Sequence, residues 1–503
     1  MKRLIFRILL LVQCSVVALS LLLSQTNNVT VDKALLPAMH SISSHTIDKY
    51  IRELASEKYQ GRLTGTPAYN ACAQWMADLL KQWGTQPSGD KGTYFQHFPN
   101  PYTLVFPGAE MILHLPIGKQ DTVRKSYVYE EEFYPGSTSD AGSITAEVVY
   151  VGYGITAPEL KYDDYEGIDV KGKIVMMDRE VPVSTDPDVE LFKKWRPYSF
   201  HDYKVNNANA HGAAGMIYNY HIVNPNCAWQ KNFILTHVSQ VVVDDIFRGS
   251  GKKHRDMVRS IQKELKPVSF ATGKLATITC KTEHHPEGVG LNVLAMIEGT
   301  DPVLKNEVIL IGAHLDHVGL NHKLMPGAND NASGVAVLME AAGALSKVRS
   351  SLKRSVAFIL FGAEEQGVKG SEYYVQHPAF QNEKTKFINL ESVGRGEKIS
   401  VSAGKNYPQI WEAFDRNNTA YIHREISTGF TSNIARPRQD LAHFLWANIP
   451  SVGLGVYGSP PVPVATYHTT QDLPEYCTPE IMEDLARLLF LATVDLASAV
   501  STQ

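Results

Sequence analysis

The pattern of apolar and polar positions along this chain alternates between helical and strand-like spacing. Apolar residues recur at helical spacing within residues 45–84, on both sides of a Gly-rich turn at residues 61–67, which predicts two helices. Apolar runs at residues 102–106 and 111–115 predict strands. We interpret these elements as the opening of a domain that a later part of the chain completes.

The C-terminal half of the chain carries the clearest alternation of strands and helices. Short apolar runs predict strands at residues 356–361, 387–390, 399–402 and 450–458. Helical spacing predicts a helix over residues 334–348, capped by Asn331 or Ser333, and a closing helix over residues 480–500. This alternation predicts an α/β fold with a mostly parallel mixed sheet flanked by helices.

The middle of the chain differs from both flanks. Residues 146–282 combine short apolar runs, one helical stretch and many glycines, and they lack clusters of His, Asp and Glu. We interpret them as a smaller β-rich domain inserted into a larger one, which consists of residues 44–145 and 283–500. Its histidines, and the pair that follows, are expected on the surface or in loops: His201, His211, His221, His284 and His285.

The N-terminus is typical of an export signal. Lys2, Arg3 and Arg7 precede an uncharged apolar run at residues 8–23, and polar residues follow. We therefore expect residues 1–25 to be a cleaved signal peptide and the mature protein to be exported, without stable membrane association. A retained membrane anchor is the alternative, because the run is about the shortest that could span a bilayer.

Composition and charge narrow the class of protein. At 503 residues the chain is too long for one ordinary core, so two domains are expected. A net charge of −4 gives no electrostatic reason to expect nucleic acid as a partner. Outside the signal, Cys72, Cys227, Cys280 and Cys477 are dispersed without a CxxC pair, which argues against a cysteine zinc site. Their disulfide pairing, or their state as free thiols, stays open.

Residues that can bind a metal stand where the apolar runs of the C-terminal half stop. These are His314, Asp330, the pair Glu364 and Glu365, and Glu391, and a further histidine follows at His468. Open α/β sheets place their sites at the carboxyl ends of the strands. Zinc takes imidazole and carboxylate ligands, and two zinc ions can share one carboxylate. Asp316, two residues after His314, is the expected acceptor that fixes the tautomer of that histidine.

Five segments, in chain order, carry a resemblance to a known family. GAHLDHVG, PGANDNASG, FGAEEQGVKGS, NLESVG and YHTTQD resemble the co-catalytic di-zinc exopeptidases, which include bacterial leucyl aminopeptidases and glutamate carboxypeptidase. GRLTGTP, near the start, matches more weakly. The insertion, with VNNANAHGAAGMI, looks like the protease-associated domain that many members carry.

The resemblance implies a role for each matching residue. His314 and Glu391 would bind one zinc ion, Glu365 and His468 the other, and Asp330 would bridge them. Many members have Asp at the position of Glu391, and glutamate remains a competent ligand.

The resemblance also implies roles around the metals. Glu364 would be the general base, and Tyr467 would either donate to the oxyanion or pack in the core. Asp472 would support His468. His317 is expected to line the cleft or pack locally.

The function expected from these residues is that of an exported aminopeptidase, a metal-dependent hydrolase with two zinc ions per chain. It would hydrolyse N-terminal peptide bonds of peptides or proteins through a water that bridges the ions. Three alternatives stay open: a carboxypeptidase, with Arg436 and Arg438 as candidate cations for the substrate carboxylate; a glutaminyl cyclase, which needs one zinc; and a non-catalytic, receptor-like module.

Overall fold

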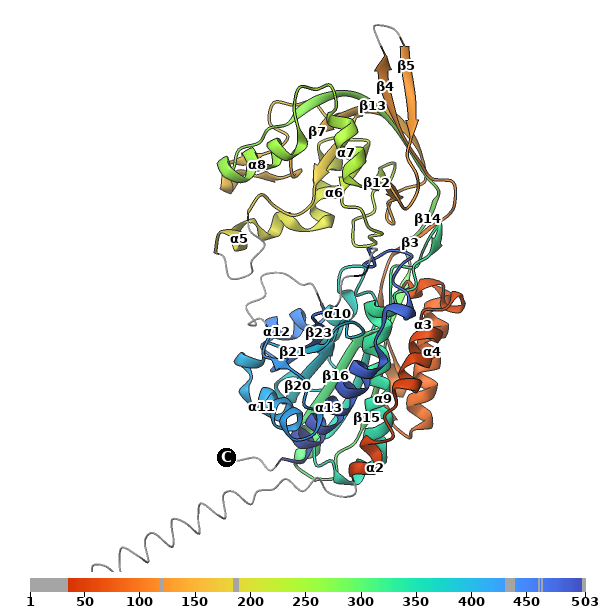
Figure 1. Ribbon diagram of the computed structural model, residues 1–503, viewed down its shortest axis with the longest axis vertical. Coiled ribbons are helices and arrows are strands. Elements are labelled where there is room, and N and C mark those ends of the chain that lie inside the picture. Colours follow the sequence, from red (N-terminus) through yellow and green to blue (C-terminus); the bar gives the residue numbers. More distant parts are fainter. Residues whose placement is uncertain are drawn as a thin grey trace, which may run out of the picture.

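The computed structural model describes residues 35–117, 121–183, 190–429, 439–459, 462 and 465–499. Within them the chain forms two bodies, one above the other in Figure 1. The expected signal peptide and the two arginines Arg436 and Arg438 lie outside the described residues. Among the described helices, none is both long enough and apolar enough to cross a membrane.

The larger body is built on a mixed sheet, which has nine strands within the described residues. In spatial order they are β1 (Gln86–Pro87), β15 (Val289–Ile297), β19 (Ser355–Phe361), β16 (Val308–His314), β20 (Thr385–Leu390), β23 (Ser451–Tyr457), β21 (Lys398–Ser402) and β22 (Ile426–Ser427), and β2 (Phe95–Pro99) also pairs with β15. The central strands β19, β16, β20 and β23 run parallel to one another. The predicted α/β fold with a mixed sheet is confirmed, and the parallel pairing that was expected for most of the sheet is found in its four central strands and between β21 and β22.

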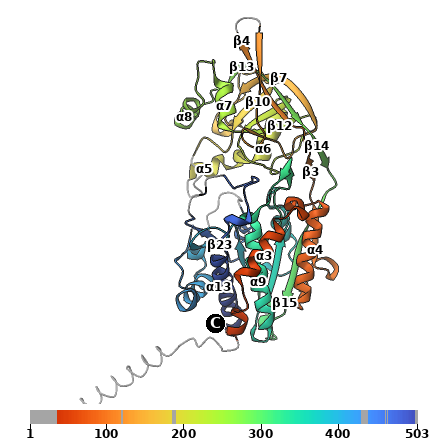
Figure 2. The ribbon, with the colours of Figure 1, turned by 45° about the vertical axis from the view of Figure 1, so that its right-hand side comes forward.

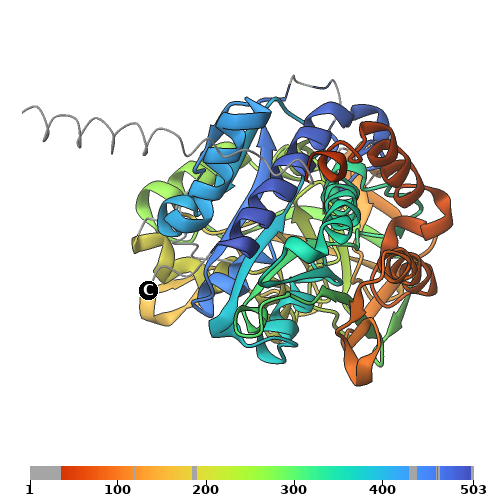
Figure 3. The ribbon, with the colours of Figure 1, turned by 90° about the horizontal axis from the view of Figure 1, so that it is seen from below.

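Both faces of this sheet are covered by helices. Ile309 and Ile311 of β16 pack in one core with α9 (Ser333–Lys347) and α13 (Pro479–Ser498). Figure 3 shows the ribbon of these helices and the sheet from below. Val308 and Leu310 face the opposite core, with α10 (Lys369–Gln376) and α12 (Leu441–Trp446). Since successive side chains of a strand point to opposite faces, β16 is buried on both. The remaining helices of this body are α2 (Leu35–Met39), α3 (Ser44–Leu54), α4 (Pro67–Gln82) and α11 (Pro408–Asn417).

The smaller body, called the insert below, holds a second sheet with eight strands in the described residues. Their spatial order is β5 (Asp121–Ser126), β4 (Glu110–Ile117), β13 (Phe270–Cys280), β7 (Gly142–Tyr150), β10 (Ile174–Asp178), β11 (Gly215–Asn219), β12 (Ile234–Val238) and β6 (Phe133–Pro135). A short hairpin, β8 (Thr156–Ala157) with β9 (Tyr162–Asp163), lies beside it. Instead of one helix the insert has α5 (Glu190–Trp195), α6 (His201–Ala210), α7 (Gln240–Phe247) and α8 (His254–Glu264).

The insert begins earlier than the sequence predicted. Strands β4, β5 and β6 belong to its sheet, and the boundary expected between residues 145 and 146 falls inside β7. The reason is that β4 pairs with β13, where Leu113 lies opposite Ala276. A pairing between segments so far apart in the chain leaves no local signal in the sequence.

A small sheet joins the two bodies (Figure 2). Its strands β3 (Tyr102–Val105) and β14 (Thr282–His285) pair antiparallel, and β17 (Leu320–Asn321) and β18 (Lys323–Leu324) extend it. His284 and His285 were expected in a loop, but they form part of β14. Their rings stack on Trp229 and Tyr102, with centroids 4.2 and 4.6 Å apart. Apolar stacking partners supplied by other segments explain why a pair of histidines is held in a strand.

The four cysteines of the described chain, Cys72, Cys227, Cys280 and Cys477, are free thiols. The first three are buried, and burial raises the pKa of Cys72 to about 12 and that of Cys280 to about 11. They act as small apolar side chains in the cores, because a buried thiol with a raised pKa is unreactive.

Candidate metal centre

The carboxyl ends of three neighbouring parallel strands supply three of the candidate ligands and the candidate general base. His314 is the last residue of β16, Glu364 and Glu365 follow β19, and Glu391 directly follows β20. Because β16 lies between β19 and β20 in the sheet, these side chains meet at one edge. Asp330 reaches the same place from the turn before α9.

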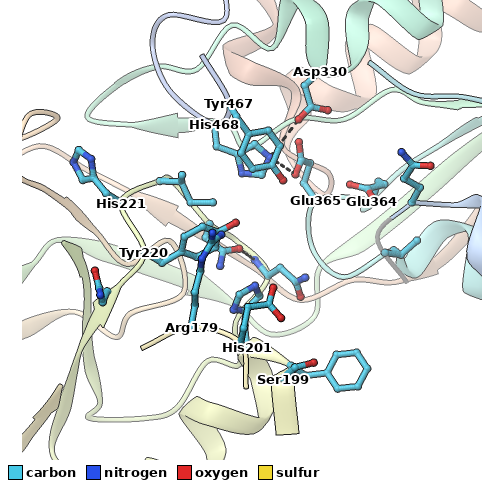
Figure 4. Close-up of a pocket in the computed structure, with 18 of the residues that line it drawn as sticks. Arg179, Ser199, His201, Tyr220, His221, Asp330, Glu364, Glu365, Tyr467 and His468 are labelled. Carbon is cyan, nitrogen blue, oxygen red and sulfur yellow. Dashed lines mark hydrogen bonds and ion pairs between the residues drawn. The ribbon is translucent and has the colours of Figure 1, made fainter. Parts of the chain in front are cut away.

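The donor atoms form two sets that share one carboxylate. Nε2 of His314 lies 3.2 Å from Oε1 of Glu391 and 3.3 Å from Oδ1 of Asp330. Nε2 of His468 lies 2.8 Å from Oε2 of Glu365 and 3.4 Å from Oδ2 of Asp330 (Figure 4). Asp330 thus offers one oxygen to each set, and this arrangement suits two ions bridged by a carboxylate.

The donor set fits zinc. Imidazole and carboxylate are ligands that zinc takes, and the donor atoms of His314, Asp330 and Glu391 lie within 4.8 Å of one another. The donor atoms of Asp330, Glu365, His468 and His317 form a second such group. Oε2 of Glu391 is buried and has no hydrogen-bond partner among the described residues, so it is available to a cation.

Residues with rare backbone angles shape the turns that carry the ligands. Ala363, directly before Glu364, has a φ of 56°, and Ser392, directly after Glu391, has a φ of 51°. His468 itself has a φ of 55°. Non-glycine residues seldom adopt such angles, and those that do gather at functional sites. The fold holds these turns in place by packing and hydrogen bonds from other segments.

Arg62, from the weakly matching segment GRLTGTP, ties two ligand-bearing loops together. Its fully buried guanidinium donates to the carbonyl of Leu315 at 2.9 Å, next to Asp316, and to those of Pro326 and Gly327, both at 2.8 Å, ahead of Asp330. A fourth bond, of 2.6 Å, goes to Leu54. Thr64 of the same segment accepts from the N–H of Ala363 at 2.7 Å. This segment therefore braces three turns of the site.

Asp316 supports His314 and also the turn that carries Glu364 and Glu365. Nδ1 of His314 lies 3.2 Å from the backbone carbonyl of Asp316 and 3.6 Å from its carboxylate, so the backbone oxygen is the nearer acceptor. The two carboxylate oxygens of Asp316 instead accept the N–H groups of Glu364 and Glu365, each at 3.2 Å. Asp316 thereby fixes the turn that aims the two glutamates.

Asp472 does not support His468, contrary to the expectation. Its carboxylate accepts from the backbone N–H of Asn329 at 3.1 Å and from that of Asp330 at 3.0 Å. It therefore positions the bridging carboxylate. The partner of His468 comes from the insert, where the backbone carbonyl of Val223 accepts from Nδ1 at 2.9 Å.

His317 contacts a ligand, which the sequence did not indicate. It is fully buried, and its Nδ1 donates to Oε1 of Glu365 at 2.8 Å. Because that carboxylate places its other oxygen 2.8 Å from His468, the two histidines hold Glu365 from both sides. The spacing HLDH was the signal available, and the contact could not be inferred from it because Glu365 comes from another strand.

The two adjacent glutamates differ in their affinity for protons. Burial raises the pKa of Glu364 well above its ordinary value, and the negative charges of Glu391 and Glu365 add to this, while His314 opposes it. Burial acts in the same direction on Glu365, but His468 and His317 outweigh it and bring its pKa to about 2. Two carboxylates with pKa values pushed apart are typical of a site where one binds a cation and the other carries protons.

Tyr467 lies beside the metal ligands and is open to solvent. Its ring stacks on that of His468 with centroids 3.8 Å apart, and 55% of the residue is exposed. Core packing, one of the two roles considered for it, is therefore wrong. Its hydroxyl is left available to a bound molecule.

The site opens into a cavity of about 930 Å³ between the two bodies. On the side of the larger body, the lining contains Asp330, Glu364, Glu365, Glu391, Tyr467 and His468. The insert side contains Arg179, Arg196, His201, Tyr220 and His221. Figure 4 shows the two groups facing each other across the cavity.

The fold and site define an α/β protein with two sets of carboxylate and histidine donors that share Asp330, covered by an inserted domain. Residues 292–493 match peptidase family M28, and residues 144–240, within the insert, match the PA domain, as the resemblance predicted.

Curated relatives are similar to about two thirds of this chain. An aminopeptidase of Pseudomonas aeruginosa is 27% identical over 360 residues, which cover 68% of this chain and 56% of that protein. Aminopeptidase YwaD of Bacillus subtilis is 28% identical over 362 residues, 68% of this chain and 67% of that protein. The chain thus spans little more than half the length of the Pseudomonas relative.

Solved structures share the fold over nearly the whole chain. An aminopeptidase from Aneurinibacillus sp. strain AM-1 superposes with a TM-score of 0.61 at 21% identity, covering 91% of this chain and 95% of that one. BSAP, a zinc aminopeptidase from Bacillus subtilis, gives 0.60 at 20% identity, with 92% and 97% covered. At these identities the likeness establishes the fold.

Proposed function

We propose that this protein is a metallo-aminopeptidase that removes residues from the free N-terminus of peptides and binds two zinc ions per chain. The observation that carries the proposal is the pair of donor sets that share Asp330. The match of residues 292–493 to family M28 and the aminopeptidase relatives support it. His314 and Glu391 would hold one ion, Glu365 and His468 the other, and Asp330 both.

The chain's own residues would carry the proton transfers. Zinc, when bound, polarises the scissile carbonyl and lowers the pKa of water. Glu364, whose raised pKa makes it a proton carrier, would take a proton from the attacking water and deliver it to the leaving amine. The Tyr467 hydroxyl would donate a hydrogen bond to the oxygen that becomes negative. The carboxylates of the cavity wall would attract the substrate's ammonium group.

The first experiment measures the zinc content of the protein and its activity on two peptides that differ only in the N-terminal amine. Purified protein is analysed for zinc per chain and is given a leucyl peptide with a free amine and the same peptide N-acetylated. We expect close to two zinc ions and release of leucine from the free peptide only. Cleavage of the acetylated peptide from its C-terminus would indicate a carboxypeptidase instead. One zinc ion, or none, with no cleavage would favour a cyclase or a binding module.

We also propose that the mature protein is exported. The support is the charged, apolar and polar order of residues 1–25, and it is independent of the site. Expression of the full chain followed by N-terminal sequencing of the secreted or periplasmic fraction tests this. A protein found only in the cytoplasm would contradict export, and an exported product that still begins at Met1 would contradict cleavage of the signal.

A further inference from the structure

The insert wall of the cavity carries a cation that the proposed chemistry does not use. Arg179 follows β10 directly, is exposed to the cavity, and lies across it from the metal ligands (Figure 4). Its guanidinium carbon lies 4.6 Å from the centroid of the Tyr220 ring. Within the described chain, no carboxylate forms an ion pair with Arg179.

Neighbouring cationic groups on this wall are already engaged. Arg196 donates to Oγ of Ser199 at 2.8 Å and stacks on Phe200. Nδ1 of His201 is hydrogen-bonded to the Tyr218 hydroxyl at 2.8 Å. Arg179 differs because its described contact is with an aromatic face.

The contact with Tyr220 prepares Arg179 for an anion. A guanidinium stacked on a ring keeps its N–H groups in a fixed plane and leaves its edge free, which suits bidentate recognition of a carboxylate. Tyr220 is itself held, since its ring stacks on His201 and its carbonyl lies 3.1 Å from Nδ1 of His237. Because Tyr220 already holds the Arg179 side chain in place, little conformational entropy is lost when an anion binds to it.

The position of Arg179 decides which anion it can meet. A peptide whose N-terminal bond lies at the metal centre extends away from the peptidase wall, and the insert forms the opposite wall of the same cavity. A volume of about 930 Å³ suits a molecule of a few residues. The group at the far end of such a peptide is its terminal carboxylate.

We propose that Arg179 binds the free C-terminal carboxylate of short peptides, so that the protein acts preferentially on oligopeptides of a few residues. This inference rests on the proposed aminopeptidase function. It adds a subsite on the insert, with Arg179 as the residue that determines specificity and Tyr220 as the residue that positions it.

The test compares peptides that differ only at the far end. Leu-Gly-Gly and its C-terminal amide are hydrolysed by the wild type and by Arg179→Met. We expect the wild type to have a kcat/KM about ten- to a hundredfold higher for the free acid, the effect usual for a charged hydrogen bond, and Arg179→Met to treat both alike. Arg179→Lys should retain part of the preference. In a series of peptide substrates of two to six residues, the preference of the wild type for the free acid should fall as the peptide lengthens.

Controls separate this proposal from the proposed function. Leucine p-nitroanilide lacks the carboxylate, so Arg179→Met should hydrolyse it at the wild-type rate; inactivity of the wild type on it would count against the aminopeptidase itself. Arg255→Met, an exposed cation of α8 outside the cavity lining, should behave as wild type. Tyr220→Leu should weaken the preference for the acid.

Two results would overturn the subsite. The first is a wild type that hydrolyses the acid and the amide equally well, or a preference that survives in Arg179→Met. The second is a higher kcat/KM of the wild type for Leu-Gly-Glu-amide than for Leu-Gly-Gly, which would mean that Arg179 binds an acidic side chain and not the C-terminal carboxylate.

Discussion

The backbone carbonyl of Val223, in the insert, accepts a hydrogen bond of 2.9 Å from Nδ1 of His468, and the Val223 N–H donates to the His468 carbonyl at 3.2 Å. The first bond places the proton on Nδ1 and leaves Nε2 facing Glu365 and Asp330, as a metal ligand requires. The insert therefore supports the candidate metal centre and also forms a wall of the cavity.

The side chain of Val223 anchors this contact. It is buried with Tyr134 of the insert and with Val318 and Met325 of the peptidase body. We expect Val223→Ala to loosen the loop and to weaken zinc binding at His468 about tenfold, the lower end of the usual effect of losing a ligand's support. Titration against a chelator of known zinc affinity measures this.

A matched control is Val205→Ala. Val205, in α6, is buried in a core made of insert residues alone, so the same atoms are removed away from the interface. This variant should be less stable but bind zinc as the wild type does. Equal zinc affinity for the two variants would show that the insert does not position His468.

Arg62 should be required for the stability of the fold and for zinc binding. Arg62→Met removes the donors to the carbonyls of Leu315, Pro326 and Gly327 and leaves these buried acceptors unpaired. We expect a loss of about 3 kcal/mol or more in the free energy of unfolding, and reduced zinc content. Thermal unfolding and metal analysis measure the two effects. Arg349→Met, which removes bonds to the carbonyls of Trp83 and Gly84 far from the site, should affect stability alone.

Substitution of the two adjacent glutamates should have different effects. Glu364→Gln should lower kcat about 10²- to 10⁴-fold while both zinc ions stay bound, because it removes a proton carrier and no metal ligand. Glu365→Gln should lose zinc, because this carboxylate lies between His317 and His468. The kcat and the zinc content of each variant, measured against the wild type, test these two expectations. Retained turnover in Glu364→Gln would refute its role as general base.

Acid should destabilise the insert through His237. Burial lowers the pKa of this residue from 6.5 to about 4, so the folded state holds it neutral where the unfolded chain takes up a proton. Its contribution to stability is present above pH 6.5 and is lost as the pH falls toward 4. At pH 5 the loss is about 2 kcal/mol. Calorimetric unfolding at pH 7.5 and pH 5 measures it, and His237→Gln should show a smaller difference between the two.

Local patterns in the sequence predicted a large part of this protein. The strands at residues 356–361 and 387–390, the helix before residue 348 and the placing of polar residues at strand ends all follow from short-range periodicity, which depends on neighbours in the chain. Because parallel strands end at one edge of a sheet, the convergence of His314, Glu364 and Glu391 could be expected as well.

Tertiary structure alone decided what supports the ligands and where the insert begins. Val223 acts through a backbone carbonyl, which every residue has, so its role leaves no mark on the sequence. The resemblance implied that Asp472 supports His468, yet Asp472 holds Asp330, because the turn before α9 lies beside it. The strand pairing that extends the insert to β4 joins segments over a hundred residues apart. Such contacts depend on how distant segments pack, which no local pattern encodes.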